Sequence, residues 1–125
     1  MRVTQTTNKM KPNPFLLTDY YKVGHVFQYP KNTTLVYSNL TPRSSRLPNT
    51  DEMVFFGLQY FIKEYLHSYF SENFFQQPKE KVINEYKRRI VTSLGDHLPT
   101  YEHLEKLHDL GYLPVEIKAL PEGSL

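Results

Sequence analysis

Three side chains on one expected helix could together hold a flat polar ring. A threonine N-cap at the start and a proline at the end delimit residues 18–30 as a helix of about three turns. At about 100° per residue, Tyr21, His25 and Gln28 share one face of that helix. They present a phenol, an imidazole and an amide, and Gly24 between them leaves room for close approach. The pattern indicates a binding surface for a planar polar heterocycle.

The same helix also has an ordinary core stripe. Its members are Tyr20, Val23 and Phe27, with Val26 at the edge. Aromatic residues at helical spacing are more often packing residues than site residues. The alternative interpretation is therefore that Tyr21 and His25 are amphipathic residues at the edge of the core, and composition and spacing leave both interpretations open.

A basic loop follows the next expected element. Apolar and polar side chains alternate in residues 34–41, which predicts a strand that ends at Pro42. Arg43 and Arg46 then flank two serines. Guanidinium forks match phosphate oxygens, so this loop could bind a phosphate or pyrophosphate group. A solvated polar loop is the alternative.

Composition limits the classes of function. The 125 residues carry a net charge of +2 and are 39% hydrophobic and 22% charged, which favours one folded domain. The basic residues are dispersed, so nothing indicates nucleic-acid binding. The absence of cysteine excludes disulfides and thiol catalysis within this segment. No apolar run is long enough for a membrane span, and no signal peptide is recognisable.

Ten tyrosines and eight phenylalanines are many for this length, and they indicate an interface or a ring-binding surface besides the core. Residues 52–70 predict a long helix, capped by Thr50 or Asp51, that is apolar nearly all round. A helix of this kind must be covered on more than one side, so we expect a partner surface for it.

Two further helices are predicted. The first covers residues 79–94 and ends at Gly95; the second begins after a Thr100 cap and stops at Gly111. Leucines at positions 104, 107 and 110 of the second helix are expected to point inward. His103 and His108 are five residues apart and therefore poorly stacked for a metal, so His97, His103 and His108 are predicted to be surface residues, not metal ligands.

Residues 115–120 predict a strand, followed by a turn at 121–123 and the start of a segment that has no second strand. We therefore expect an α+β fold, with helical segments and a small antiparallel sheet. We also expect a flexible tail at 1–13 and an incomplete N-terminal domain at 14–125, the front part of a longer protein.

Several ordered blocks resemble the start of the nicotinamide phosphoribosyltransferases. They are Thr18-Asp19-Tyr20-Tyr21-Lys22-Val23-Gly24-His25, Gln28-Tyr29-Pro30, Val36-Tyr37-Ser38, Val54-Phe55-Phe56-Gly57-Leu58-Gln59-Tyr60 and Leu113-Pro114-Val115-Glu116-Ile117-Lys118-Ala119-Leu120-Pro121-Glu122-Gly123. The segment Asn39-Leu40-Thr41-Pro42-Arg43-Ser44 is more similar to the bacterial and phage forms than to the animal ones. The similarity extends from about Phe15 to the last residue.

The resemblance implies an enzyme that joins nicotinamide to phosphoribosyl pyrophosphate, giving nicotinamide mononucleotide and pyrophosphate in NAD salvage. It implies an irregular α/β barrel of type II with an added domain, a homodimer with shared active sites, magnesium and ATP as cofactors, and a cytoplasmic location. By the same resemblance, Tyr21 stacks on the pyridine ring across the dimer interface, Asp19 lies close to that site, and Arg43 lies near the phosphates. No catalytic residue and no metal ligand falls in this segment, so the fragment alone is expected to be inactive.

Two alternatives stay open. The related nicotinate phosphoribosyltransferase would need extra positive charge for a carboxylate substrate. A stand-alone interaction module would instead offer the apolar helix at residues 52–70 to a partner protein.

Overall fold

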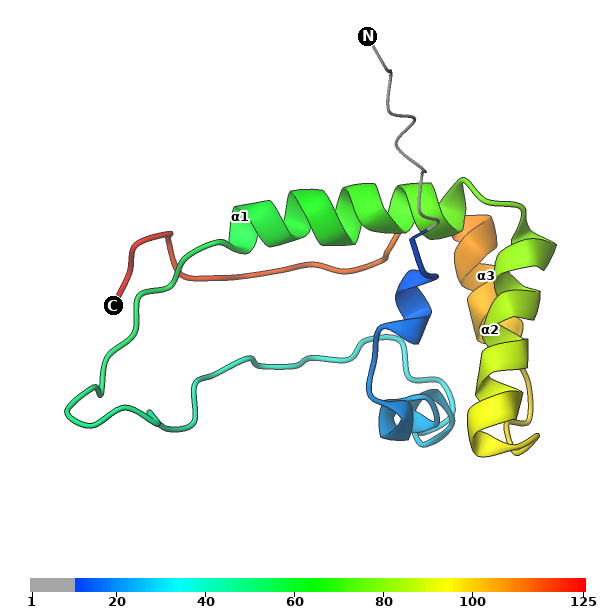
Figure 1. Cartoon of the computed structure of the whole chain (residues 1–125), viewed down its shortest axis with the longest axis horizontal. Helices are drawn as coiled ribbons and strands as arrows, with labels where there is room; N and C mark the ends of the chain where they lie inside the picture. The colour runs from blue at the N-terminus through cyan, green and yellow to red at the C-terminus, as the bar shows by residue number, and fades with distance from the viewer. Residues whose placement is uncertain (1–10) are drawn as a thin grey trace, which may run out of the picture.

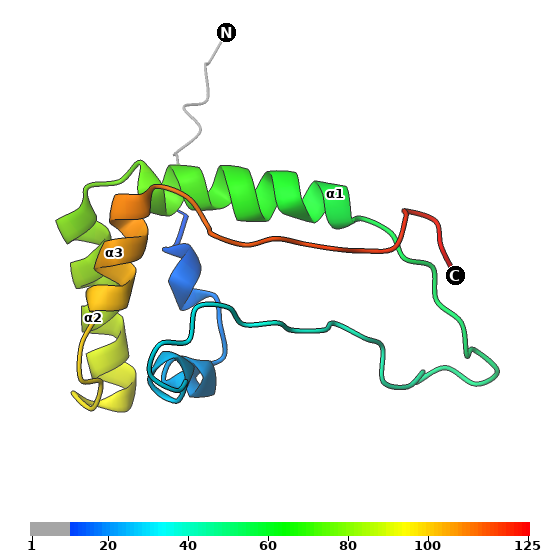
Figure 2. The same ribbon diagram turned by 180° about the vertical axis from the view of Figure 1, so that it is seen from behind.

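The computed structural model describes residues 11–125, which fold into helices with two long extended arms, one between η3 and α1 and one after α3 (Figures 1 and 2). The elements in chain order are the 3₁₀ turns η1 (Pro14–Leu16), η2 (Tyr20–Lys22) and η3 (His25–Phe27), then α1 (Leu58–Phe61), η4 (Ile62–Tyr69), η5 (Ser71–Phe75), α2 (Lys79–Leu94) and α3 (Glu102–Leu110). The first arm comprises residues 33–57 and the second arm residues 112–125.

The segments α1, η4 and η5 form one long helix, residues 58–75 (Figure 1). Much of it has π-type hydrogen bonding, in which an amide donates to the carbonyl five residues earlier. The Phe70 amide donates to the Tyr65 carbonyl in this way, and the Gln76 amide donates to the Ser71 carbonyl at 2.8 Å. The helix then turns sharply into α2.

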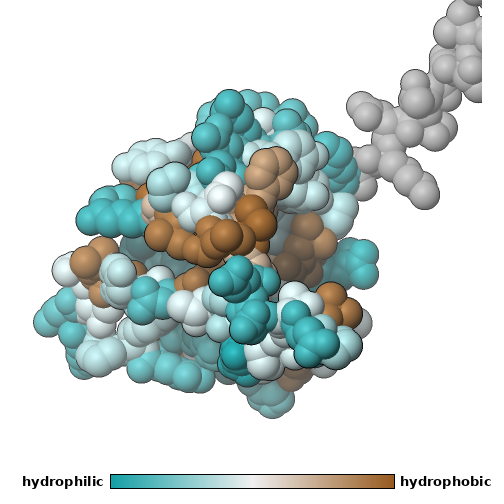
Figure 3. All heavy atoms as spheres, turned by 90° about the vertical axis from the view of Figure 1, so that its left-hand side faces the viewer, coloured by the Kyte–Doolittle hydropathy of each residue, from teal (hydrophilic) through white to brown (hydrophobic). Residues whose placement is uncertain are grey.

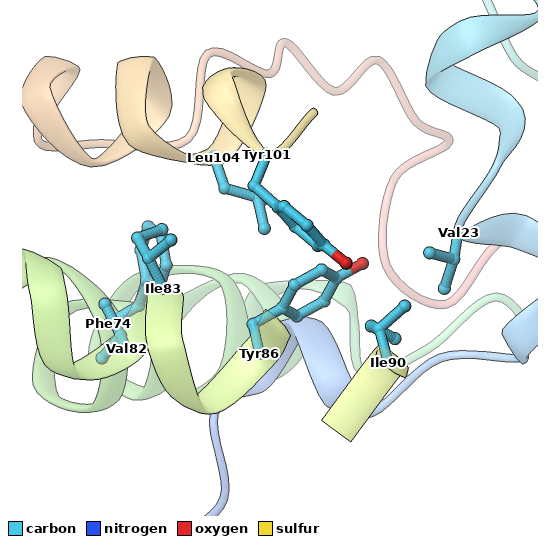
Figure 4. Packing of buried hydrophobic residues seen from close by; sticks show 8 residues of the cluster. All are labelled: Val23, Phe74, Val82, Ile83, Tyr86, Ile90, Tyr101 and Leu104. Carbon is cyan, nitrogen blue, oxygen red and sulfur yellow. The ribbon is translucent and has the colours of Figure 1, made fainter. Parts of the chain in front are cut away.

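The core lies where α2 and α3 pack against the end of the long helix and against η2 (Figure 4). Its buried hydrophobic members are Val23, Phe74, Val82, Ile83, Tyr86, Ile90, Tyr101 and Leu104. Phe15 of η1 packs its ring edge-on against Phe70 and Phe74, with centroid distances of 5.3 and 4.8 Å. Asn13 is 2% exposed, and its side-chain amide donates to the Val82 carbonyl at 3.0 Å.

The expected helix at 79–94 is confirmed with the predicted bounds, and Gly95 ends it with a φ of 78°. The expected short helix is confirmed as α3, which stops at Gly111. The N-cap of α3 is Tyr101, one residue after the predicted cap, and the Thr100 hydroxyl accepts from the Glu102 amide at 3.1 Å. Of the expected tail, residues 1–10 lie outside the described residues, and the Pro12 carbonyl accepts from the Tyr69 hydroxyl at 2.8 Å.

The expectation of an α+β fold is wrong: the described part of the chain is all helical and contains no strand. Residues 34–41 and 115–120 are extended, but neither has a neighbouring strand. The two arms do share a short backbone pairing, in which Phe55 donates to Ser124 at 2.7 Å and accepts from Gly123 at 2.8 Å. A strand requires a ladder of backbone partners, which residues 11–125 do not supply.

The long helix also differs from its predicted bounds of 52–70, because it begins at Leu58 and runs to Phe75. Gly57, with a φ of 92°, sets the start by adopting a left-handed conformation. Neither Thr50 nor Asp51 caps it. The carboxylate of Glu122, from the second arm, accepts from the amides of Gly57 at 2.7 Å and Gln59 at 3.2 Å.

The helix expected at 18–30 is divided into η2 and η3, with Gly24 between them in place of a continuous α-helix. Glycine weakens a helix, and the neighbouring residues form i to i+3 hydrogen bonds, such as the Val23 amide to the Tyr20 carbonyl at 3.1 Å. Among residues 11–125, no helix is both long enough and apolar enough to cross a membrane.

The capping contact of Glu122 generates a prediction. Hydrogen bonds from Gly57 and Gln59 lower the pKa of the Glu122 carboxyl. The contact is therefore fully present above the ordinary glutamate pKa and is lost as the pH falls through the lowered pKa. Glu122→Ala should accelerate amide hydrogen exchange at Gly57 about fivefold at neutral pH, because the helix loses its cap.

Exchange measured by NMR, corrected for intrinsic rates, checks this prediction. Glu116→Ala is the matched control, because that carboxylate pairs with Lys118 at 3.5 Å on the same exposed arm and does not cap the long helix. Equal Gly57 exchange in both variants would contradict the capping role.

Candidate functional site

The η2–η3 segment is attached by one side to α2 and α3. Val23 is buried, and its side chain faces Ile90 of α2 (Figure 4). The Ser93 hydroxyl donates to the Tyr20 hydroxyl at 3.2 Å. The Phe27 ring meets the His103 ring edge-on at 5.6 Å, with an interplanar angle of 89°. These contacts leave the other side of the segment free for binding.

Tyr21 lies on that free side, where its side chain is 70% exposed. The rings of Tyr21 and His25 are 5.8 Å apart at an interplanar angle of 62°, and the Lys22 ammonium lies 5.7 Å from the Tyr21 ring centroid. A Cβ added to Gly24 would meet nothing within 4 Å. The exposed face of the Tyr21 ring can therefore accept a second flat ring by stacking.

Asp19 lies at the start of η2, where it lines one side of an open surface hollow. The hollow has a volume of ≈ 430 Å³ and is lined by Leu16, Leu17, Thr18, Asp19 and Lys22. The Lys22 ammonium is 3.9 Å from the Asp19 carboxylate, with both side chains more than half exposed. An exposed pair of this kind contributes little stability, so both charges are available to a ligand.

Arg43 lies elsewhere, in the exposed first arm. It forms no ion pair or hydrogen bond with another residue in the range 11–125. The first arm leads away from η2 and η3 in both ribbon views (Figures 1 and 2). The structure thus brings Asp19, Tyr21 and His25 together in one short segment and leaves Arg43 on a separate one. Gln28 is exposed at the end of η3.

The prediction that all three histidines are surface residues holds for His97, which is exposed, and is wrong for the other two. The His103 Nδ1 is buried without a hydrogen-bond partner, and burial lowers the pKa of this imidazole. The His108 Nε2 lies 2.9 Å from the Gln77 carbonyl, and its ring lies 5.2 Å from the Phe74 ring. Tertiary packing by η3 and the long helix covers both side chains.

The sequence did not predict two contacts between distant residues. It placed Tyr20 in the core stripe, and it placed Glu122 in a turn without assigning it a contact. Tyr20 meets Ser93 across 73 positions, and Glu122 meets Gly57 across 65. Local patterns report contacts three or four residues apart, so neither partner could be found from spacing.

The described residues carry no candidate metal site, because no three His, Cys, Asp or Glu side chains within 11–125 come together. Large apolar side chains, in contrast, are widely exposed on the long helix and both arms. Figure 3 views the end of the molecule where the arms meet, and apolar atoms gather across the middle of that face. On the long helix, the exposed large hydrophobic residues are Tyr60, Phe61 and Tyr65.

Comparison with known proteins identifies relatives. The family model for the N-terminal domain of nicotinamide phosphoribosyltransferase matches residues 13–117. The nicotinamide phosphoribosyltransferase of Acinetobacter baylyi is 55% identical over 117 residues, covering 90% of this chain and 23% of the relative. The chain thus spans about a quarter of the length of that curated relative. No solved structure matches the chain.

The contrast between exposed and buried tyrosines generates a prediction. Tetranitromethane, which attacks the phenolate, should nitrate Tyr21 readily and leave Tyr86 unmodified. Tyr86 is 5% exposed, and burial raises its pKa, so the reactive form is both scarce and inaccessible. Peptide mass spectrometry checks the sites of modification, with Tyr21→Phe as the control for peptide assignment. Nitration of Tyr86 as fast as of Tyr21 would contradict the arrangement of the site.

Proposed function

The chain belongs to the nicotinamide phosphoribosyltransferase family, and from that premise we propose that it is the N-terminal part of an enzyme that transfers phosphoribosyl from phosphoribosyl pyrophosphate to nicotinamide. The products would be nicotinamide mononucleotide and pyrophosphate, the salvage step toward NAD. The observation that carries the proposal within this segment is the exposed Tyr21 ring, on the side of η2 that faces away from the core.

Tyr21 would act by holding the pyridine ring. The pyridine nitrogen is a modest nucleophile, and displacement at the anomeric carbon of ribose passes through an oxocarbenium-like state. A stacked aromatic face binds the pyridine ring with its nitrogen toward the anomeric carbon, and it contributes about 0.5–1.5 kcal/mol to binding beyond the area that it buries. His25, whose ring lies beside Tyr21 at 5.8 Å, would support the phenol ring from one edge and remain a structural residue.

Asp19 would lie beside the bound ring, since it shares η2 with Tyr21 and borders the open hollow. Arg43 would contact the phosphates of the sugar substrate. As pyrophosphate departs, its negative charge grows, and a guanidinium fork stabilises that charge through paired hydrogen bonds. Because the first arm leads away from η2, this role requires the arm to approach a site formed with other parts of the enzyme.

Magnesium and ATP are proposed for the whole enzyme on family grounds alone. The described residues do not fit a metal site, so we assign neither group a ligand in this segment and derive no step through them. The residues that perform the chemical step would likewise lie in other parts of the enzyme, so the segment alone would be inactive.

We also propose that the active enzyme is a homodimer in the cytoplasm, with Tyr21 entering the active site of the partner subunit. The exposed apolar row Tyr60, Phe61 and Tyr65 supports a partner surface on the long helix. The chain matches 23% of the bacterial relative, which supports the proposal that other parts of the enzyme pack on this surface of the long helix. A stand-alone interaction module would use the same surface, and a well-behaved monomeric fragment would argue against both.

Nicotinate is the second candidate substrate. A carboxylate substrate requires positive charge beside the ring, and the Lys22 ammonium, 5.7 Å from the Tyr21 centroid, is the observation that favours it. Competition between nicotinamide and nicotinate for the full-length enzyme distinguishes the two, because the preferred substrate has the higher kcat/KM.

Removal of the Tyr21 ring tests the stacking role. Tyr21→Ala in the full-length enzyme should lower kcat/KM for nicotinamide at least about tenfold, because the ring loses its stacking partner. Tyr112→Ala is the matched control, since Tyr112 is another exposed tyrosine and lies outside η2 and η3. Steady-state kinetics with unchanged constants for Tyr21→Ala would remove this role.

Removal of the Arg43 guanidinium tests the phosphate contact. Arg43→Ala should raise the KM for phosphoribosyl pyrophosphate about tenfold, because charge-assisted hydrogen bonds to phosphate are lost. The KM for nicotinamide should change little. Arg89→Ala, at an exposed position of α2, serves as a control for the loss of one positive charge. An equal rise in KM for both variants would indicate a general charge effect and contradict a specific contact.

A further inference from the structure

Tyr20, the neighbour of Tyr21, makes a contact that the proposed function does not use. We propose that Tyr20 is a positioning residue: its hydroxyl accepts a hydrogen bond from Ser93 of α2 and so fixes the direction in which Tyr21 presents its ring. The inference rests on the proposed function, because it assigns Tyr20 a part in holding the same heterocycle.

The geometry of η2 links the two tyrosines. A 3₁₀ turn has about three residues per turn, so residues at i and i+3 lie on the same side and adjacent residues lie about 120° apart. Tyr20 and Val23 are such a pair, and both contact α2. Tyr21 follows Tyr20 directly, so its side chain must leave the turn in another direction, consistent with its 70% exposure.

The surface that receives η2 has a matching spacing. Ile90 and Ser93 are three residues apart on α2 and therefore share a face of that helix. Val23 faces Ile90 in Figure 4, and Tyr20 meets Ser93 at 3.2 Å. Two residues of the turn thus rest on two residues of the helix, which defines both the position and the rotation of the turn.

The two contacts differ in what they restrict. Apolar burial of Val23 holds the turn against the core but is non-directional. The hydrogen bond between Ser93 and Tyr20 has a preferred geometry, so it limits rotation about the Val23 contact. Gly24 follows Val23 directly, and a glycine permits many backbone directions at that end of η2. The turn therefore needs an anchor at its Tyr20 end.

Loss of this bond should weaken binding without slowing the chemical step. Tyr21 would stack on the ring in the ground state and in the transition state alike, and a change in uniform binding alters KM with kcat unchanged. Tyr20→Phe keeps the aromatic ring and removes only the hydroxyl. We expect it to raise the KM for nicotinamide about threefold to tenfold, the range of one net hydrogen bond.

The kinetic test uses the full-length enzyme with Tyr20→Phe, Ser93→Ala and the double variant. Because both substitutions remove the same bond, the double variant should show the same KM as either single variant. Tyr112→Phe, an exposed tyrosine away from η2, is the control and should match the unsubstituted enzyme. An unchanged KM in Tyr20→Phe, or fully additive effects in the double variant, would overturn the proposal.

A second measurement separates failure of this inference from failure of the proposed function. The Val23 amide donates to the Tyr20 carbonyl at 3.1 Å, so its hydrogen exchange reports the order of η2. In the 125-residue chain, Tyr20→Phe should accelerate that exchange about threefold or more. Unchanged exchange, with nicotinamide use lost in Tyr21→Ala, would overturn the positioning role alone. Faster exchange, with unchanged KM in both variants, would overturn the proposed function and the role of Tyr20 with it.

Discussion

Burial of the apolar face of α2 is the interaction on which the rest of the structure depends. Val82, Ile83, Tyr86 and Ile90 are spaced so that they share one side of this helix, and each is buried. The long helix covers one end of that face through Phe74, which is fully buried. Residues of η1, α3 and the end of η2 also pack over it, so one helix face joins segments from both ends of the described chain.

This arrangement supports the proposed binding residues on one side only. The buried Val23 holds η2 to the core, while the opposite side of the segment carries Tyr21 and His25 in the open. A side chain that must contact a ligand needs a fixed backbone and an exposed ring, and the division between η2 and η3 provides both. Two of the sequence-predicted ligand residues, Asp19 and Tyr21, share that segment, whereas Arg43 lies on an arm with few contacts.

The two arms have strand-like sequences but lack backbone partners for most of their length within residues 11–125. Residues 34–41 and 115–120 have the alternation of strands, yet they remain extended without a ladder. The arms do contact each other and the long helix: Phe55 pairs with Ser124, and Glu122 caps the long helix. Large apolar side chains are exposed along both arms and the long helix, which is consistent with the partner surface proposed above.

The sequence by itself determined the family, the bounds of α2 and the stop of α3 at Gly111, and it singled out Tyr21. These features depend on order and local spacing, because helix periodicity, proline and glycine act over a few residues. The tertiary structure decided that no strand forms within residues 11–125, that His103 and His108 are partly covered, and that Tyr20 contacts Ser93. Each of these outcomes needs a partner distant in the chain, and the distance between such partners is set by packing, which local spacing does not encode.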